Sequence, residues 1–372
     1  MTDRHVTYLT LDPVGEGVGT SQVARYVMAL PARGIAVTLH SFERTSPSQQ
    51  LADDLQRAGV TWHVHAFGGL GARGGLSRLA RATIAIRRAP LVHARSDLAA
   101  AAASSRERAW VWDMRAFFAD QRIALGTLRP GSAEDRALRS IERRSAQRAA
   151  GIVTLANAAV PIMESRHGLS VAAKCRVITT CVDLDRFELS ELPKGRPVFL
   201  LAGTLNTYYD VPAMLALAGR ARATRRSCLV VASPEQSAWE TALSIADSRI
   251  AVSPLEMPRV ITEAHVGLCI CRADAGVSLR AAMPTKLGEF LATGRPVIVN
   301  AGLGDMDEII RRHKCGVVLD GSSPESIDRA LTELDALIAD TNTPARCRNA
   351  AETHFDLHRG VDELVKIYES IS

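Results

Sequence analysis

The chain has no CxxC cysteine pair and no long apolar run. These two absences argue against a disulfide-rich or zinc-binding protein and against a membrane-spanning one. Its 372 residues include seven cysteines, none in a CxxC pair. Such scattered thiols argue against a disulfide framework and a structural zinc site, so we expect reduced, buried thiols and no metal. No run of about 18 uncharged apolar residues occurs, so no transmembrane helix is expected. The start, MTDRHVTYLTLDP, lacks the apolar core of a signal peptide. We therefore expect a soluble, cytoplasmic protein.

What the chain does contain is ordinary globular composition with an uneven charge. Hydrophobic residues make up 47% and charged residues 23%, which supports sizeable cores, and the length favours two domains. Residues 1–185 carry 24 Lys and Arg against 16 Asp and Glu, whereas the remainder carries 21 against 24. This imbalance favours a first domain that meets an anionic ligand or surface, with a solvated arginine-rich surface as the alternative. No nucleic-acid partner is expected.

Short apolar runs alternate with helical patterns along the whole chain. This alternation predicts βαβ units and parallel sheets covered on both faces. We therefore predict an α/β protein with two doubly wound, Rossmann-like domains facing a cleft, where the carboxyl ends of the strands hold the ligand. The predicted strands are Val6–Leu11, Ile35–His40, Val60–His65, Leu91–His93, Ala109–Trp112 and Gly151–Leu155, then Pro197–Ala202, Cys228–Ala232, Ile250–Val252, Val266–Cys271, Pro296–Val299 and Gly316–Leu319.

Domain boundaries are placed from composition. The stretch Glu188–Arg196 is polar, carries Pro and Gly, and is the best linker candidate. We expect a first domain at 1–187, a second at 188–356, and a last helix at 357–372 that packs back toward the first domain.

A glycine-rich segment follows the first predicted strand. Gly15, Gly17 and Gly19 precede a helical pattern, so backbone N–H groups there could approach an anion. A dinucleotide fingerprint would need GxGxxG and a later acidic residue, whereas here the spacing is GxGxG with Glu43 near the second strand's end. The alternative is a plain turn with Thr20 or Ser21 as the helix cap.

Charged residues also cluster after the fifth predicted strand, in WDMRAFFADQR. Arg115 could meet a phosphate or carboxylate, and Asp113 could accept a proton or bind sugar hydroxyls. The alternative is a surface ion pair, Asp113–Arg115 or Asp120–Arg122.

The most specific stretch is SLRAAMPTKLGEFLATGRPVIVNAGLGDMDEII. Pro284 suits the first turn of a helix, predicted at Pro284–Thr293. Lys286 and Glu289 are three residues apart and share one face. The helix N-terminus, Lys286 and Arg280 could hold a diphosphate, while Glu289 could bind hydroxyls of a ribose or sugar. The alternative is an amphipathic helix with an exposed Lys–Glu pair.

These motifs together resemble those of a family-four glycosyltransferase of the GT-B fold. GVGTSQVARYVMALPARGIAVTLHSFE is similar to that family's opening, and WDMRAFFADQR, VDLDRF, AGTLNTYYDVPAML and PTKLGEFLATGRPVI follow in the expected order. The resemblance implies a retaining, metal-independent transferase that needs no cofactor. Its substrates are a nucleotide-diphosphate sugar and a small-molecule, glycan or lipid-linked acceptor. It assigns the acceptor to 1–187 and the donor to 188–356.

Carried over by position, the resemblance implies roles for single residues. Lys286, with Asp113 and Arg115, is expected to take part in catalysis. Glu289 would hold the ribose, and Leu255 would lie near the base. The other expected donor-binding residues are Gly17, Gly19, Thr204, Tyr208, Arg280, Pro284 and Thr285.

Two departures from the family pattern weaken the expected donor site. Ala281 stands where many relatives have a first glutamate. Thr204 and Tyr208 stand where many relatives have Arg and Lys. The phosphate charge must then be met by Lys286 and Arg280. A non-catalytic sugar-nucleotide-binding protein and a sugar-nucleotide epimerase therefore stay open as alternatives.

The stretch Arg73–Arg88 mixes arginines with Leu76, Leu79 and Ile84. A basic amphipathic helix of this kind can lie on an anionic bilayer, which would add peripheral contact with the inner face of the membrane. The alternative is a helix packed on its own sheet with its arginines in solvent.

Overall fold

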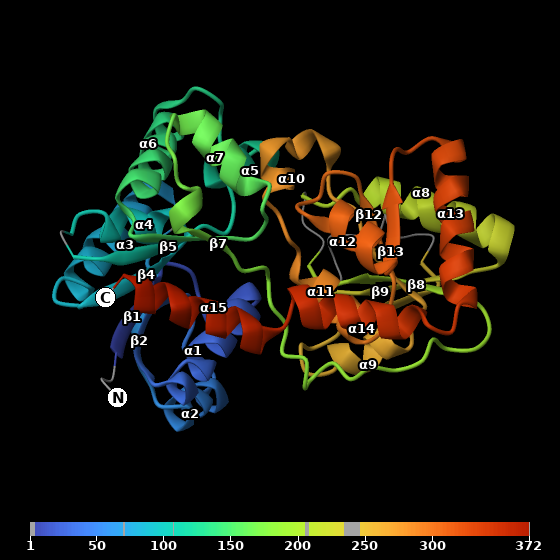
Figure 1. Ribbon diagram of the computed structural model, residues 1–372, viewed down its shortest axis with the longest axis horizontal. Coiled ribbons are helices and arrows are strands. Elements are labelled where there is room, and N and C mark those ends of the chain that lie inside the picture. The colour runs from blue at the N-terminus through green and yellow to red at the C-terminus, as the bar shows by residue number, and fades with distance from the viewer. Residues whose placement is uncertain (1–3, 70, 107, 205–207, 234–245, 372) are drawn as a thin grey trace. The chain divides into compact units, whose positions relative to one another are not determined.

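The structure is a computed structural model that describes residues 4–69, 71–106, 108–204, 208–233 and 246–371 (Figure 1). The chain forms two compact units. The first comprises Met1–Thr179 with Leu357–Ser372, and the second comprises Thr180–Asp356. Each unit is described by itself.

The first unit is built on a seven-stranded parallel sheet in the order β3-β2-β1-β4-β5-β6-β7. Strand addition reverses between β1 and β4, so the carboxyl ends of these two strands mark the switch point where such sheets bind ligands. The strands are β1 (Arg4–Thr10), β2 (Ile35–Glu43), β3 (Val60–Ala66), β4 (Leu91–Arg95), β5 (Trp110–Asp113), β6 (Gly151–Thr154) and β7 (Cys175–Val177).

Helices connect these strands and cover the sheet (Figure 1). The helical pattern that follows Gly19 begins as a π-helical turn, η1, that continues into α1. The helices are η1 (Thr20–Ala24), α1 (Arg25–Ala29), η2 (Pro31–Arg33), α2 (Gln49–Arg57), α3 (Gly71–Ala85), α4 (Ser96–Ala103), α5 (Phe118–Ala124), α6 (Ala133–Arg148), α7 (Ala159–His167), η3 (Ala172–Lys174) and α15 (Leu357–Ser370).

The second unit is built on a six-stranded parallel sheet in the order β10-β9-β8-β11-β12-β13. Here the switch point lies between β8 and β11. The strands are β8 (Val198–Ala202), β9 (Cys228–Ala232), β10 (Ser248–Ile250), β11 (Val266–Cys269), β12 (Val297–Asn300) and β13 (Gly316–Leu319). The helices are α8 (Val211–Arg225), α9 (Met257–Thr262), η4 (Ala273–Ala275), α10 (Val277–Arg280), α11 (Thr285–Ala292), α12 (Met306–His313), α13 (Pro324–Ala339) and α14 (Thr343–His354).

The prediction of two parallel α/β sheets is confirmed, and the predicted strands lie within a few residues of the observed ones. The strand predicted at Ile250–Val252 lies slightly earlier, at Ser248–Ile250. One strand, β7, was not predicted. Its three residues CRV pair with β6 at the sheet edge, and so short a run carries no alternating pattern to detect.

The segment chosen as the linker, Glu188–Arg196, is tied into the second unit. The fully buried Arg295 donates to the Ser190 and Glu191 carbonyls, both at 2.9 Å. The boundary between the units falls instead between Thr179 and Thr180. Polar composition alone could not reveal that one buried arginine binds this segment.

The last helix, α15, belongs to the first unit and contacts α1. The Tyr368 hydroxyl lies 2.9 Å from His93 Nδ1 on β4. Gly151 of β6 lies so close to Ile367 that a Cβ there would meet its Cγ2 at 2.8 Å. Close packing of α15 therefore depends on a glycine in the sheet.

Candidate functional site

The start of α11 presents Lys286 and Glu289 close to the end of β8. Pro284 precedes the first turn in an extended conformation, and no side chain caps the helix N-terminus. The Thr180 hydroxyl donates to the Met283 carbonyl at 2.8 Å and supports this turn. Free N–H groups at such a helix end favour anions.

Lys286 is buried and makes no hydrogen bond or ion pair with any described residue. Its ammonium lies 3.9 Å from the centroid of the Tyr209 ring, a cation–π contact. It also approaches Gly203, where an added Cβ would lie 3.9 Å from Nζ. Burial lowers the pKa of Lys286, against the opposing effect of Cys269, Cys271 and Glu289. A buried cation without an acceptor points to an anionic ligand.

Glu289 is half-buried and likewise makes no hydrogen bond or ion pair with a described residue. Burial raises its pKa to about 7, although Lys286 and Arg186 act in the opposite direction. Arg186 also donates to the Pro254 carbonyl at 3.0 Å. Arg186 therefore belongs to this site, and sequence analysis missed it because its motif, VDLDRF, shows no link to α11.

Two glycines lock α11 in place. A Cβ at Gly267 of β11 would lie 2.3 Å from the Phe290 ring. A Cβ at Gly288 would lie 2.7 Å from Val182 and 3.0 Å from Phe355. Helix α11 thus rests directly on the sheet and on α14, and this close packing holds Lys286 and Glu289 rigidly.

The Tyr208–Tyr209 pair lies on a short bridge to the strand end at Cys271. The Tyr208 hydroxyl lies 3.2 Å from Ser278 Oγ, and the two tyrosine rings meet edge to face. Tyr208 is buried, so its hydroxyl serves the protein here rather than facing solvent. Tyr209, which sequence analysis did not select, is the one that contacts Lys286.

The other expected donor residues differ in exposure. Pro284 and Thr285 are half-buried at the start of α11, whereas Thr204 and Arg280 are exposed. Leu255 is 80% exposed. Residues 205–207 of the expected phosphate loop lie outside the described residues. Ala281, at the position of the expected first glutamate, is buried.

In the first unit, the glycine-rich segment is held by Glu43. Its carboxylate accepts from the Val14 N–H at 2.8 Å and from the Gly15 N–H at 3.1 Å. Glu43 is thereby occupied and unavailable to a ribose, which contradicts the dinucleotide alternative. Gly19 is required because a Cβ would lie 2.0 Å from the Pro13 carbonyl. Gly17 is exposed, with a φ of +56° that favours glycine.

The expected helix cap at this segment is wrong. The Thr20 and Ser21 hydroxyls donate to the carbonyls of Val14 and Val18 rather than accepting from helix N–H groups. The helix start at Gly19 has no side-chain cap.

Asp113 and Arg115, the candidates after β5, are bound to each other. Arg115 donates to Asp113 Oδ1 at 3.1 Å, and His93 Nε2 lies 3.4 Å from Asp113 Oδ2. Burial alone would raise the pKa of Asp113, but Arg115 and His93 outweigh it and hold the pKa well below its usual range. A carboxylate with so little proton affinity is a weak general base. Arg115 also donates to Gln22 at 3.3 Å. A small cavity beside them, lined by Tyr8, Tyr26, Gln22 and both charged residues, has room for about one water.

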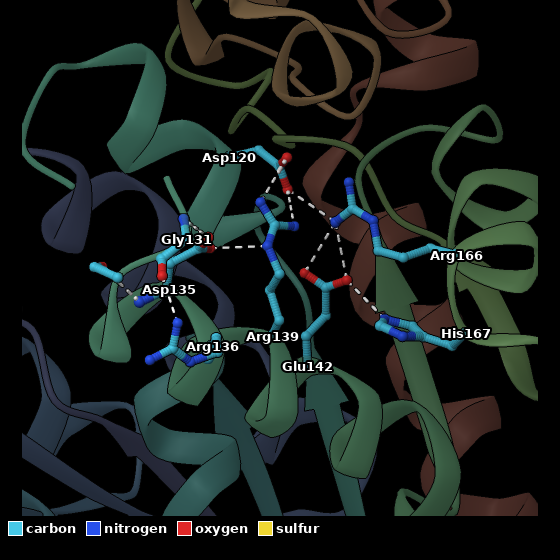
Figure 2. A network of polar contacts seen from close by, with 9 residues as sticks. Asp120, Gly131, Asp135, Arg136, Arg139, Glu142, Arg166 and His167 are labelled. Carbon is cyan, nitrogen blue, oxygen red and sulfur yellow. Dashed lines mark hydrogen bonds and ion pairs between the residues drawn. The ribbon is translucent and has the colours of Figure 1, made fainter. Parts of the chain in front are cut away.

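Figure 2 shows the ion pairs around Asp120 of the same motif. Asp120 pairs with Arg139 and Arg166, and Glu142 binds Arg166 and His167. Arg122 pairs with Glu134. The alternative of an Asp120–Arg122 ion pair is therefore wrong, while the Asp113–Arg115 pair is present, with Asp113 buried and Arg115 half-buried. The network ties α5 to α6 and α7 and so supports the loop after β5.

Within the described ranges, no three His, Cys, Asp or Glu side chains gather as a metal site would require. Among the helices of those ranges, none combines the length and apolarity needed to cross a bilayer.

No protein-family model matches the chain, and no curated protein matches it. Solved structures do. Sucrose-phosphate synthase from Thermosynechococcus elongatus superposes with a TM-score of 0.73 at 13% identity, covering 99% of this chain and 98% of that one. WaaG, a glycosyltransferase involved in lipopolysaccharide biosynthesis, gives 0.71 at 14%, covering 98% and 99%. Anabaena HepE in complex with UDP and glucose gives 0.69 at 13%, covering 98% and 99%. The chain has the GT-B fold of these glycosyltransferases.

Proposed function

We propose that the protein is a glycosyltransferase that moves a sugar from a nucleotide-diphosphate sugar to a small-molecule, glycan or lipid-linked acceptor. The observation that carries the proposal is the pair Lys286 and Glu289. Lys286 is buried and Glu289 half-buried at an uncapped helix N-terminus, and neither makes a hydrogen bond or ion pair with a described residue. HepE, which shares the fold, has been crystallised with UDP-glucose.

In this proposal the leaving diphosphate meets the N–H groups of α11 and the ammonium of Lys286. The packing of α11 on the sheet fixes the direction of these groups, so they stabilise developing charge without reorganisation. Glu289 accepts hydrogen bonds from ribose or sugar hydroxyls. Arg186 lies close enough to Glu289 to favour its ionised, accepting form.

We further propose transfer with retention and without a metal. The bond from the anomeric carbon to the phosphate oxygen breaks while the acceptor oxygen bonds to the same face of that carbon. The acceptor's proton passes to the departing phosphate oxygen, so no protein base is obligatory. Asp113, held ionised by Arg115, then serves on the acceptor side by fixing Arg115 rather than by taking a proton.

Screening UDP, GDP, ADP and TDP for thermal stabilisation tests the nucleotide site, because a ligand that binds only the folded state stabilises it. We expect one of the four to raise the melting temperature and Glu289→Gln to weaken its binding. No stabilisation by any of them would overturn the proposal. Incubating the matching nucleotide sugar without acceptor separates the alternatives. Slow release of nucleoside diphosphate supports a transferase, an epimerised sugar supports an epimerase, and no turnover with or without acceptors supports a binding protein.

We also propose that α3 lies on an anionic membrane surface. Leu76 and Ile84 are 67% and 72% exposed. Arg73 is exposed on the same face, and Arg87 and Arg88 are exposed just past the helix end. No Asp or Glu occurs between Asp54 and Asp97, so nothing acidic in this segment opposes an anionic bilayer.

The opposite face of α3 agrees with the alternative of a helix that packs on its own domain. Arg78 is buried, donates to the Phe67 and Gly69 carbonyls and stacks on the Phe67 ring at 3.8 Å. Only part of the arginine set is therefore in solvent. Co-sedimentation with phosphatidylglycerol vesicles at low salt should be reduced by Leu76→Ser with Ile84→Ser. Equal sedimentation of wild type and variant, or none by either, would reject the membrane proposal.

A further inference from the structure

The carboxyl edge of the first sheet gathers arginines near two exposed carboxylates, Asp12 and Glu16, and Glu16 pairs with Arg44 at 3.3 Å. Arg95 ends β4, directly between Thr10 of β1 and Asp113 of β5 in the strand register. Arg44 follows β2, and Asp12 follows β1. This edge is the switch point of the sheet, where doubly wound folds bind their ligands.

Arg95 is only 8% exposed, yet its guanidinium makes no hydrogen bond to any described residue. Its Nε is buried without a partner. The nearest carboxylate oxygen, Asp12 Oδ2, is 3.9 Å from Nη1, and the Asp12 side chain is 61% exposed. A solvated carboxylate at that distance contributes little to a buried guanidinium. Buried arginines are normally paired, so Arg95 lacks its partner.

The charges around Arg95 do not supply that partner. Asp113 is engaged by Arg115 and His93. Burial lowers the pKa of Arg78, as do the nearby Arg81 and Arg44, whereas Asp12 acts to raise it. Asp97, in the first turn of α4, is buried, and burial together with Glu142 raises its pKa well above the usual range. Apart from the Arg44–Glu16 pair, these contacts leave an excess of positive charge at the edge.

The backbone next to Arg95 is also suited to an anion. Helix α4 begins at Ser96 and has no side-chain cap. Ser96 has a φ of +74°, a strained value for a residue other than glycine, and its hydroxyl makes no hydrogen bond to a described residue. Strained residues of this kind concentrate at functional sites.

We propose that Arg95, with Ser96 and the start of α4, forms a phosphate-binding subsite for an acceptor that carries a phosphate group. A guanidinium fork beside free helix N–H groups matches the several acceptor oxygens of a phosphate. The assignment of the phosphate to the acceptor rests on the proposed transferase function. The binding of phosphate at Arg95 does not depend on that function.

The test is calorimetric titration of the Lys286→Ala protein with inorganic phosphate, because this background removes the donor-site cation. Adding Arg95→Gln should raise the dissociation constant roughly tenfold or more, the scale of one charge-assisted hydrogen bond. Asp12→Asn should lower it, because it removes the exposed carboxylate that lies 3.9 Å from the Arg95 guanidinium. The control Arg143→Gln, at an exposed position on α6, should leave it unchanged.

A dissociation constant within twofold of the background for both Arg95→Gln and Asp12→Asn would overturn the subsite, because phosphate would then bind adventitiously. If Arg95→Gln does not fold, Arg95→Lys and the exposed Asp12→Asn still decide the question by their opposite signs. None of these titrations uses a nucleotide. Their outcome therefore tests the phosphate subsite even if the transferase proposal is wrong.

Two further titrations identify where the phosphate comes from. Arg95-dependent binding of glycerol 3-phosphate indicates a soluble phosphate monoester. Arg95-dependent binding to phosphatidic acid vesicles alone indicates a lipid headgroup. Either result supports the subsite. If neither probe shows binding that depends on Arg95, the subsite is contradicted.

Discussion

The two units treat their candidate charges in opposite ways. In the second unit, the buried Lys286 and the half-buried Glu289 make no hydrogen bond or ion pair with a described residue. In the first, Asp113 is bound by Arg115, with His93 and Tyr8 close to its other oxygen. Charge left unpaired in a buried place costs free energy that a ligand can recover, whereas charge already paired mainly holds the protein together. The comparison predicts that mutations at Lys286 change function and mutations at Asp113 change stability.

The largest effect is expected at Asp113. Asp113→Ala leaves Arg115 buried without its carboxylate, which should lower the free energy of unfolding by about 3–5 kcal/mol. Chemical denaturation at pH 7 measures this loss. Because the folded-state pKa of Asp113 is depressed, its stabilisation is present above the unfolded pKa and is lost as pH falls below about 4. A loss under 1 kcal/mol would show that the buried pair is not structural.

Substitution of Lys286 should lower activity rather than stability. Lys286→Ala should cut turnover by about 100-fold or more, the scale of one lost electrostatic stabiliser, and leave the unfolding free energy equal or higher. Steady-state kinetics with the donor identified by the nucleotide screen measures the change. Lys194→Ala, at an exposed position in the same unit, is the matched control. Turnover of Lys286→Ala within threefold of wild type would remove Lys286 from the mechanism.

The raised pKa of Glu289 predicts how the free energy of unfolding changes with pH. Its pKa is raised to about 7 by burial, so the stability it contributes is present at low pH and is lost as pH rises through 7. Between pH 5 and 8 the ligand-free protein should lose roughly 2 kcal/mol of unfolding free energy through this group. Glu289→Gln should remove that part of the pH dependence. Parallel curves for wild type and variant would indicate that Glu289 titrates normally.

The smallest effect is expected at Tyr209. Its ring stabilises the charged form of Lys286, so Tyr209→Leu should lower the Lys286 pKa and move the alkaline limb of nucleotide binding to lower pH by about one unit. Tyr209→Phe keeps the ring face and should leave the limb in place. Calorimetric titration with the nucleoside diphosphate across pH 7 to 10 provides the measurement. Identical limbs for Leu and Phe would exclude the cation–π contact as the cause.

Much of the candidate site around α11 could be predicted from sequence because its signals are local. Pro284, Lys286 and Glu289 fall within one helix start, and helical spacing is enough to place the two charged groups on one face. Arg186 and Tyr209 could not be found this way. They reach the site from segments about 100 and 77 positions before it, counted from Lys286, and nothing in their own motifs indicates that contact.

The sequence by itself determined the alternation of strands and helices, the two parallel sheets and the helix that carries Lys286. Each of these follows from the spacing of apolar residues along the chain. Only the tertiary structure decided which charges have partners. Glu43 binds the glycine-rich backbone, Asp113 lies next to His93, and the Arg95 guanidinium makes no hydrogen bond with a described residue. The reason is physical: whether a buried charge is paired depends on residues that folding brings together from distant parts of the chain.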